Sequence, residues 1–178
     1  MAQKAIIYKT ELQIADMDRH RYRNYSLTVA RHPSETNVRM MARLLSFALN
    51  ASEELKFTKG ISTDDEPDIW EKNLTDDILL WIVLGQPGEK HLRKACGRAD
   101  EVIVYTYQQR SAELWWKQFK DSSQRFDNLK VFSINEEACK SLTQLVNRHI
   151  HLQCTVQDGE CWITHGESTV HVILQQWK

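Results

Sequence analysis

One uninterrupted apolar segment limits the folds that are open to this chain. Seven consecutive apolar residues, Ile78 to Leu84, are followed directly by a turn of Gly85-Gln86-Pro87-Gly88. A short apolar run that ends in turn residues is typical of a strand covered on both faces. Beyond the turn, apolar residues recur at helical spacing among basic residues, at Leu92, Ala95, Cys96 and Ala99. The segment predicts a central strand that leads through a loop into a basic helix, and such loops carry the sites of many α/β proteins.

Length and charge narrow the class of protein. With 178 residues and a formal net charge of -1, residues 1–178 are expected to form a single domain with a substantial core. Binding of a polyanion would therefore need local basic clusters. No apolar run approaches the ~20 residues of a membrane span, and the N-terminus lacks the apolar segment of a signal peptide. We expect a cytoplasmic protein that does not enter a membrane and whose four cysteines are reduced.

Strand and helix patterns alternate along the rest of the chain. Strands are predicted over residues 5–14, 25–29, 55–61, 101–107, 129–134 and 170–174. Helices are predicted over residues 35–49, after Arg110 and after Asn135, with Ser34, Ser111 and Asn135 as their N-caps. The first two strands are expected to pair as a hairpin, and Asp158-Gly159 marks another between residues 150–157 and 160–165. The pattern predicts an α/β fold: a mixed sheet with flanking helices and a β-hairpin at each end.

Acidic residues provide the candidates for a site. Glu35 lies three residues before Val38 on the apolar stripe of the first helix. It could complement the helix dipole as a first-turn acid, or it could aim a carboxylate inward at a site. Asp64, Asp65, Glu66 and Asp68 surround Pro67. This stretch could be a solvated loop, or it could supply the one or two carboxylates that Mg²⁺ takes from proteins.

Cysteine and aromatic clusters favour structural roles over chemical ones. The two-residue turn places Cys154 and Cys161 on one apolar face, where a buried cysteine acts as a small hydrophobe, and their spacing matches no familiar zinc pattern. Trp115, Trp116 and Phe119 fit core packing better than a platform for nucleic-acid bases. The chain also lacks a Walker loop, a GxGxxG turn, an HExxH helix and a GxSxG elbow.

Several short motifs, taken together, closely resemble the YaeQ family of small bacterial proteins, and the resemblance covers nearly the whole chain. The motifs are Tyr8-Lys9, Asp16-Met17-Asp18-Arg19, Ala30-Arg31-His32-Pro33-Ser34-Glu35-Thr36, Asp65-Glu66-Pro67 with Trp70, Trp81-Ile82-Val83-Leu84-Gly85-Gln86-Pro87 and Arg93-Lys94-Ala95. The resemblance implies a variant of the PD-(D/E)xK nuclease core, an α/β fold that agrees with the strand and helix order.

The resemblance also implies a set of site residues. In nucleases of that class a helical Glu and acids on nearby strands bind Mg²⁺, which neutralises charge on the scissile phosphate and lowers the pKa of bound water. Glu35 resembles the helical Glu, and Asp65 and Glu66 are the candidates for the second acid. Lys94 and Gln86 would aid the attacking water or stabilise charge.

The chain departs from the family pattern at Val83, where the family usually carries an acid. A valine cannot bind a metal, so the implied Mg²⁺ site would be weakened unless Asp76 or Asp77 compensates. Two functions remain open: a Mg²⁺-dependent phosphodiesterase acting on nucleic acid, with Arg93 and Arg98 contacting the phosphate backbone, and a non-catalytic binding or regulatory protein on a nuclease-like scaffold.

Overall fold

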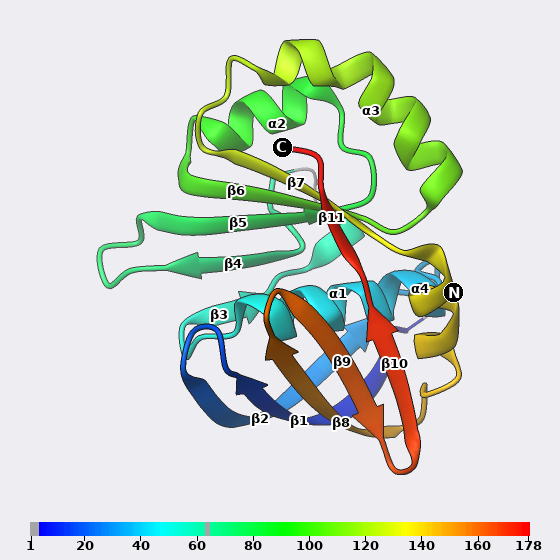
Figure 1. The fold of residues 1–178 in the computed structure, drawn as a ribbon. Coiled ribbons are helices and arrows are strands. Elements are labelled where there is room, and N and C mark those ends of the chain that lie inside the picture. Colours follow the sequence, from blue (N-terminus) through cyan, green and yellow to red (C-terminus); the bar gives the residue numbers. More distant parts are fainter. Residues whose placement is uncertain (1–3, 63–64) are drawn as a thin grey trace.

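The computed structural model describes residues 4–62 and 65–178 of the chain. Its helices and strands, coloured along the chain in Figure 1, follow in the order β1 (Ile6–Asp16), β2 (Arg21–Arg31), α1 (Asn37–Asn50), β3 (Leu55–Phe57), the 3₁₀ turn η1 (Gly60–Ser62), β4 (Ile69–Lys72), β5 (Ile78–Leu84), α2 (Glu89–Cys96), β6 (Ala99–Thr106), α3 (Gln109–Ser123), β7 (Leu129–Ile134), α4 (Glu136–Thr143), β8 (His149–Gln157), β9 (Glu160–His165), β10 (Ser168–Val172) and β11 (Leu174–Gln176). No helix in these ranges combines the length and the apolar character that a bilayer span requires.

The strands form two sheets. A six-stranded sheet has the order β11-β7-β6-β5-β4-β3, with β5, β6 and β7 parallel and the outer pairs antiparallel. A five-stranded sheet has the order β10-β9-β8-β1-β2, in which β1 and β8 are parallel. The predicted mixed α/β fold is confirmed, and both terminal hairpins are present. These hairpins join each other through the β1–β8 pairing, so they form a sheet of their own.

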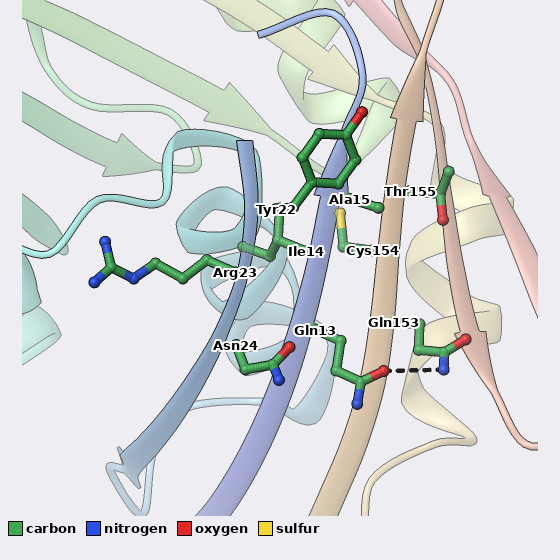
Figure 2. Close-up of a pocket in the computed structure, with 9 residues that line it drawn as sticks. All are labelled: Gln13, Ile14, Ala15, Tyr22, Arg23, Asn24, Gln153, Cys154 and Thr155. Atoms are coloured by element: carbon green, nitrogen blue, oxygen red, sulfur yellow. Dashed lines mark hydrogen bonds between the residues drawn. The ribbon is translucent and has the colours of Figure 1, made fainter. Parts of the chain in front are cut away.

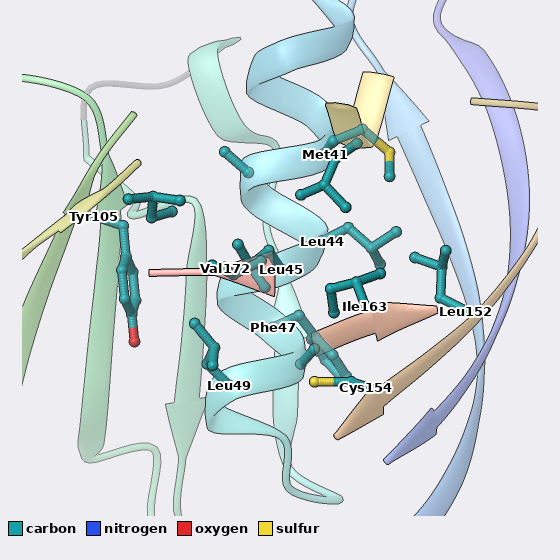
Figure 3. Close-up of a cluster of buried hydrophobic side chains, with 14 of the residues drawn as sticks. Met41, Leu44, Leu45, Phe47, Leu49, Tyr105, Leu152, Cys154, Ile163 and Val172 are labelled. Carbon is teal, nitrogen blue, oxygen red and sulfur yellow. The ribbon is translucent and has the colours of Figure 1, made fainter. Parts of the chain in front are cut away.

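Helix α1 lies between the two sheets (Figure 1). Its side chains belong to one large apolar cluster with Leu152, Cys154 and Ile163 of the five-stranded sheet and Tyr105 of the six-stranded sheet (Figure 3). Both cysteines of the hairpin, Cys154 and Cys161, are buried there as the alternation predicts. A helix buried on all sides accounts for the long apolar run of α1, since ten consecutive residues of it, 40–49, are buried.

The central strand β5 has the bounds that the apolar run predicts, and both its faces are covered. Ile82 and Leu84 face the cluster of α1, while Trp81 and Val83 pack in a second apolar cluster with Leu92 of α2. Phe119 of α3 is buried in this second cluster, and Trp115 and Trp116 are partly buried against it, in agreement with the predicted core packing. Strand β5 is therefore held between two apolar clusters, one on each face.

Several element ends differ from the predicted ones because local hydrogen bonds compete with the pattern. Helix α1 begins two residues later than Ser34 predicts: Glu35 N donates to His32 O at 2.9 Å in a turn, and Thr36 Oγ1 accepts from Arg39 N as the N-cap. The strand predicted over residues 55–61 ends at Phe57, because Gly60 has a φ of 60° and its N–H donates to Thr58 Oγ1.

Three other ends also shift or change partners. Helix α2 stops at Cys96, so Ala99 begins β6 and does not extend the helical stripe. Helix α3 begins at Gln109, and Ser111 Oγ donates back to Gln108 O from within the first turn. Asn135 is the N-cap of α4 as predicted, but its Oδ1 accepts from Ile173 N at 2.8 Å and so fixes the step from β10 to β11.

Candidate functional site

Two carboxylates and two guanidiniums meet where α1 faces the end of β5. We call this set, Glu35, Arg39, Arg43 and Asp68, the Glu35 cluster. Arg39 bridges the acids, with Nη1 2.9 Å from Glu35 Oε1 and Nη2 2.5 Å from Asp68 Oδ1. Arg43 forks onto Glu35, with Nε 3.1 Å from Oε1 and Nη2 2.8 Å from Oε2. The four side chains form one continuous network of charge-assisted hydrogen bonds.

The local sequence explains why these side chains converge. The turn at residues 32–35 directs Glu35 inward, just ahead of α1. Arg39 and Arg43 follow at intervals of four residues and therefore share one face of the helix. Asp68 immediately precedes β4; its N–H donates to Ile82 O and its Oδ2 accepts from Leu84 N at 2.8 Å. The pairing of β4 with β5 thus fixes the second acid.

The cluster is buried and formally neutral. Side-chain exposure is 3% for Glu35, 4% for Arg43, 5% for Asp68 and 15% for Arg39. Burial opposes the charge on Arg39, but Asp68 and Glu35 outweigh it and raise the pKa of the guanidinium above its ordinary value. Every one of the four carboxylate oxygens accepts a hydrogen bond from an arginine or from Leu84 N. Each oxygen of the two carboxylates is therefore bonded to a donor of the protein.

The acids predicted to share a metal have different partners in the structure. Glu35 is held by the two arginines, whereas the Asp65 carboxylate accepts a hydrogen bond from Lys94 Nζ at the surface. That bond lowers the pKa of Asp65, and the charge of Lys94 adds to the effect. Glu66 is half-buried. The acid that the structure brings to Glu35 is Asp68, which lies in the same acidic loop.

A divalent metal therefore does not fit this arrangement of donors. No oxygen of Glu35 or Asp68 is without a donor, and Val83 supplies no third carboxylate. Within residues 4–62 and 65–178, no three His, Cys, Asp or Glu side chains are grouped so that they could hold an ion. A metal bound between Glu35 and Asp68 would have to displace the Arg39 guanidinium first.

The remaining predicted residues divide between two places. Lys94 and Arg98 both contact Asp65, Arg98 through Nη1 and the Asp65 backbone oxygen at 3.3 Å. Arg93 pairs with Glu89 at 3.1 Å on the exposed side of α2. Gln86 lies apart from these, with Nε2 3.4 Å from Ser111 Oγ at the start of α3. Gln86, which follows β5, and Glu35 both lie at the carboxyl end of the parallel strands.

A cavity of about 570 Å³ opens at that end of the sheet. It is lined from three elements, by Thr36, Val38, Tyr107, Gln108, Arg110, Ser111, Leu114, Glu136, Cys139 and Lys140. Tyr107 connects the cavity to the Glu35 cluster: burial raises the pKa of its hydroxyl, Arg39 opposes this, and Asp68 and Glu35 add to it. Ligands of open α/β sheets commonly bind in such crevices outside the carboxyl ends of parallel strands.

Sequence reasoning missed Arg39, Arg43 and Tyr107 as members of a site, and it named Asp68 only as one of four acids around Pro67 while preferring Asp65 and Glu66. Arg43 lies within a run of apolar residues, and a charged residue at a core position of a helix is a sign of a buried partner. The four-residue spacing from Glu35 to Arg39 to Arg43 identifies that partner on one helix face. Asp68 carries no comparable local signal, because its role depends on the pairing of β4 with β5.

Comparison with known sequences places the chain in one family. The sequence model of the family described as "YaeQ protein" matches residues 1–174. The uncharacterised protein YaeQ of Escherichia coli (strain K12) is 43% identical over 178 residues, covering 100% of this chain and 98% of that protein. The protein of the same name from Salmonella typhi is 41% identical over the same length.

Solved structures agree with this result. The crystal structure of the YaeQ protein from Xanthomonas axonopodis pv. citri superposes with a TM-score of 0.95 at 42% identity and covers 98% of both chains. The YaeQ protein from Pseudomonas syringae superposes with a TM-score of 0.94 at 32% identity, over 98% of this chain and 96% of that chain.

Proposed function

The chain belongs to the YaeQ family, and from this premise we propose that it binds single-stranded nucleic acid without cleaving it. The bound segment enters the cavity beside the Glu35 cluster. One observation supports the absence of cleavage above all others: the two buried acids, Glu35 and Asp68, are neutralised by Arg39 and Arg43. The cluster then acts as a structural brace that shapes the cavity wall.

The cost of burying the Glu35 and Asp68 carboxylates explains why arginine partners oppose metal binding at this cluster. Two carboxylates that are at most 5% exposed need cationic partners, and the guanidiniums supply them within the protein. Exchanging Arg39 for Mg²⁺ would require both a dehydrated ion and a new partner for the displaced guanidinium. Mg²⁺ dehydrates reluctantly and prefers sites that leave it several waters. On this basis the cluster is a poor competitor for the ion.

The cavity itself suits a nucleotide of a flexible strand. Its volume of about 570 Å³ is in the range of small-ligand sites and too small for a duplex. Apolar surface from Val38, Leu114 and Tyr107 offers contact to a base, and the side chains of Arg110 and Lys140 can meet phosphate oxygens at the rim. Glu136 pairs with Lys140 at 2.6 Å and sets its position.

Fluorescence anisotropy with a labelled single-stranded oligonucleotide in EDTA tests the proposal. We expect binding without metal, an affinity that falls as salt rises, and a loss of about tenfold in the double variant Arg110→Ala/Lys140→Ala. Leu114→Trp, which fills the cavity, should also weaken binding. Arg148→Ala, an exposed arginine just before β8, serves as the control and should bind as the natural chain does. Equal binding by all four proteins, or no binding at low salt, would refute the proposal.

A second function, a Mg²⁺-dependent phosphodiesterase, is favoured by a different observation. Glu35 and Asp68 come from separate elements, yet the Arg39 guanidinium contacts both at the end of β5, so its displacement would leave two buried carboxylates in need of a cation. Here Glu35 and Asp68 would hold the metal only after Arg39 leaves them, and the metal would supply charge neutralisation at a phosphate. Val83→Glu would restore the acid of the family pattern, and a gain of Mg²⁺-dependent cleavage that is absent from the natural chain would indicate a lost active site. Cleavage by the natural chain, abolished by Glu35→Gln, would establish this function over the first.

A further inference from the structure

The outer face of the five-stranded sheet carries ordered rows of side chains far from the Glu35 cluster. Strand register defines the rows, because residues directly opposite one another project to the same face. Along β1 the even-numbered residues face the core, so Gln13 and Ala15 face outward. Each of them begins a row that crosses the sheet.

The first row has aromatic residues at its two sides and small residues between them. In order it contains Tyr22, Ala15, Thr155, Trp162 and His171. Tyr22 is 64% exposed, and Trp162 is half-buried because the His171 ring stacks on it with centroids 5.3 Å apart and planes at 11°. Three strand spacings separate Tyr22 from Trp162, which is about 14 Å. Ala15 and Thr155 thus form the floor of a trough whose aromatic wall is Tyr22, and Trp162 lies beyond Thr155 on the next strand.

The second row supplies amides and hydroxyls. It contains Asn24, Gln13, Gln153, Thr164 and Thr169. Gln153 Nε2 donates to Gln13 Oε1 at 3.0 Å, as Figure 2 shows, and this bond orients both amides. Among the described residues, Gln13 Nε2 and Gln153 Oε1 have no side-chain hydrogen bond of their own. One donor and one acceptor therefore lie side by side and face solvent.

Two adjoining hollows follow these rows. The larger, of about 610 Å³, is lined by Tyr22, Ala15 and Thr155 of the first row and by Asn24, Gln13 and Gln153 of the second (Figure 2). A smaller one of about 280 Å³ shares Gln13 and Gln153 with it and continues past Thr164. Together they form a continuous surface that an elongated ligand could follow.

The two charged residues that line these hollows both have partners, Arg23 in an ion pair and Glu11 in a hydrogen bond. Arg23 extends away from the row (Figure 2) and pairs with Glu53, while Glu11 accepts from Ser26 Oγ at 2.7 Å. No other Lys, Arg, Asp or Glu is among the described lining residues. A surface for a polyanion needs a track of basic residues, so this one suits an uncharged ligand.

From this combination we infer that the outer face of the five-stranded sheet binds a neutral oligosaccharide. The apolar face of a sugar ring stacks on an aromatic wall, where its C–H groups meet the electron-rich ring face. Its hydroxyls, each both donor and acceptor, pair with the oriented amides of Gln13 and Gln153 and with Asn24. The site is independent of the proposed nucleic-acid cavity, which lies at the six-stranded sheet.

Calorimetric titration with maltohexaose, cellohexaose and chitohexaose tests the inference on the full chain. We expect at least one of them to bind, a loss of about tenfold in Tyr22→Ala, and retention of affinity in Tyr22→Phe, which keeps the ring. Thr155→Trp, which fills the trough but removes no wall, should abolish binding. Leu74→Ala, at an exposed apolar residue on the β4–β5 turn, is the matched control for loss of exposed apolar surface.

Three results would overturn the inference. These are no heat from any of the three sugars at millimolar concentration, binding that Tyr22→Ala and Thr155→Trp leave unchanged, and a Tyr22-dependent dimer in sedimentation. Binding of a poly-dT oligonucleotide that Tyr22→Ala abolishes would likewise replace the sugar with nucleic acid. Circular dichroism of each variant checks that it is folded, so that a loss of binding heat can be assigned to the binding surface.

Discussion

Arg43 is the residue whose position in the core most needs its partners. Its guanidinium is 4% exposed, bonds Glu35 with two nitrogens, donates to Ala30 O at 2.8 Å and lies over the Phe57 ring. Removing it leaves the Glu35 carboxylate with less compensation in the core. We expect Arg43→Ala to lower the free energy of unfolding by about 3–5 kcal/mol in denaturant titrations.

The control for Arg43 is a surface pair of similar geometry. Lys130 contacts Glu101 at 2.6 Å, but both side chains are well exposed. Lys130→Ala should therefore cost at most about 1 kcal/mol. A cost for Arg43→Ala no larger than that of Lys130→Ala would show that the Glu35 cluster does not brace the fold.

The buried hydroxyl of Tyr105 should make the free energy of unfolding depend on pH in the alkaline range. Burial raises the pKa of its hydroxyl to about 12, partly opposed by the hydrogen bond from Asn50 Nδ2. Since the unfolded chain releases this proton near pH 10, the folded state binds more protons above that pH, and stability must fall as pH rises from about 10 to 12. Tyr105→Phe should make that decline shallower in urea titrations. An unchanged slope would show that Tyr105 does not contribute to it.

At the scale of elements, the turns of the two hairpins are hydrogen-bonded to each other. Asp158 and Gly159 have φ values of 54° and 77°, as a tight two-residue turn requires, and their N–H groups both donate to the Asp18 carboxylate at 2.8 Å. The β1–β2 turn thereby holds the β8–β9 turn. We expect Asp18→Ala to destabilise the chain by about 1–3 kcal/mol. Asp127→Ala, at an exposed aspartate before β7, should change stability by less than about 0.5 kcal/mol.

Sequence patterns predicted the elements well where the pattern is local. The run at Ile78–Leu84 and the Asp158-Gly159 turn each specify their element within a few residues, and both are present as expected. The helix begins at Asn37 and not directly after Ser34, because the turn at His32 uses the backbone N–H of Glu35. The site was less predictable, because its members come together through strand pairing and not through local sequence. Asp65 and Asp68 are equivalent acids by sequence, and only the β4–β5 pairing brings Asp68 to Arg39.

At the scale of the molecule, α1 packs between two sheets. No local sequence pattern could predict that the strands divide into two sheets. Whether the terminal hairpins extend the central sheet or form another depends on the parallel pairing of β1 with β8, residues far apart in sequence. Because Leu44 and Phe47 of α1 are about 1% exposed in the shared core, Leu44→Ala should cost about 2–5 kcal/mol. In the Leu44→Ala variant we expect hydrogen exchange of the backbone amides to accelerate in both sheets. Acceleration in one sheet alone would contradict a shared core.

The most direct test of the account is a Mn²⁺ titration of the natural chain, followed by electron paramagnetic resonance. The central claim is that Arg39 and Arg43 already satisfy Glu35 and Asp68. The account predicts no Mn²⁺ bound at this cluster in the natural chain, and an Arg39→Met variant that gains a site. Stoichiometric Mn²⁺ binding by the natural chain that Glu35→Gln and Asp68→Asn each abolish would contradict it.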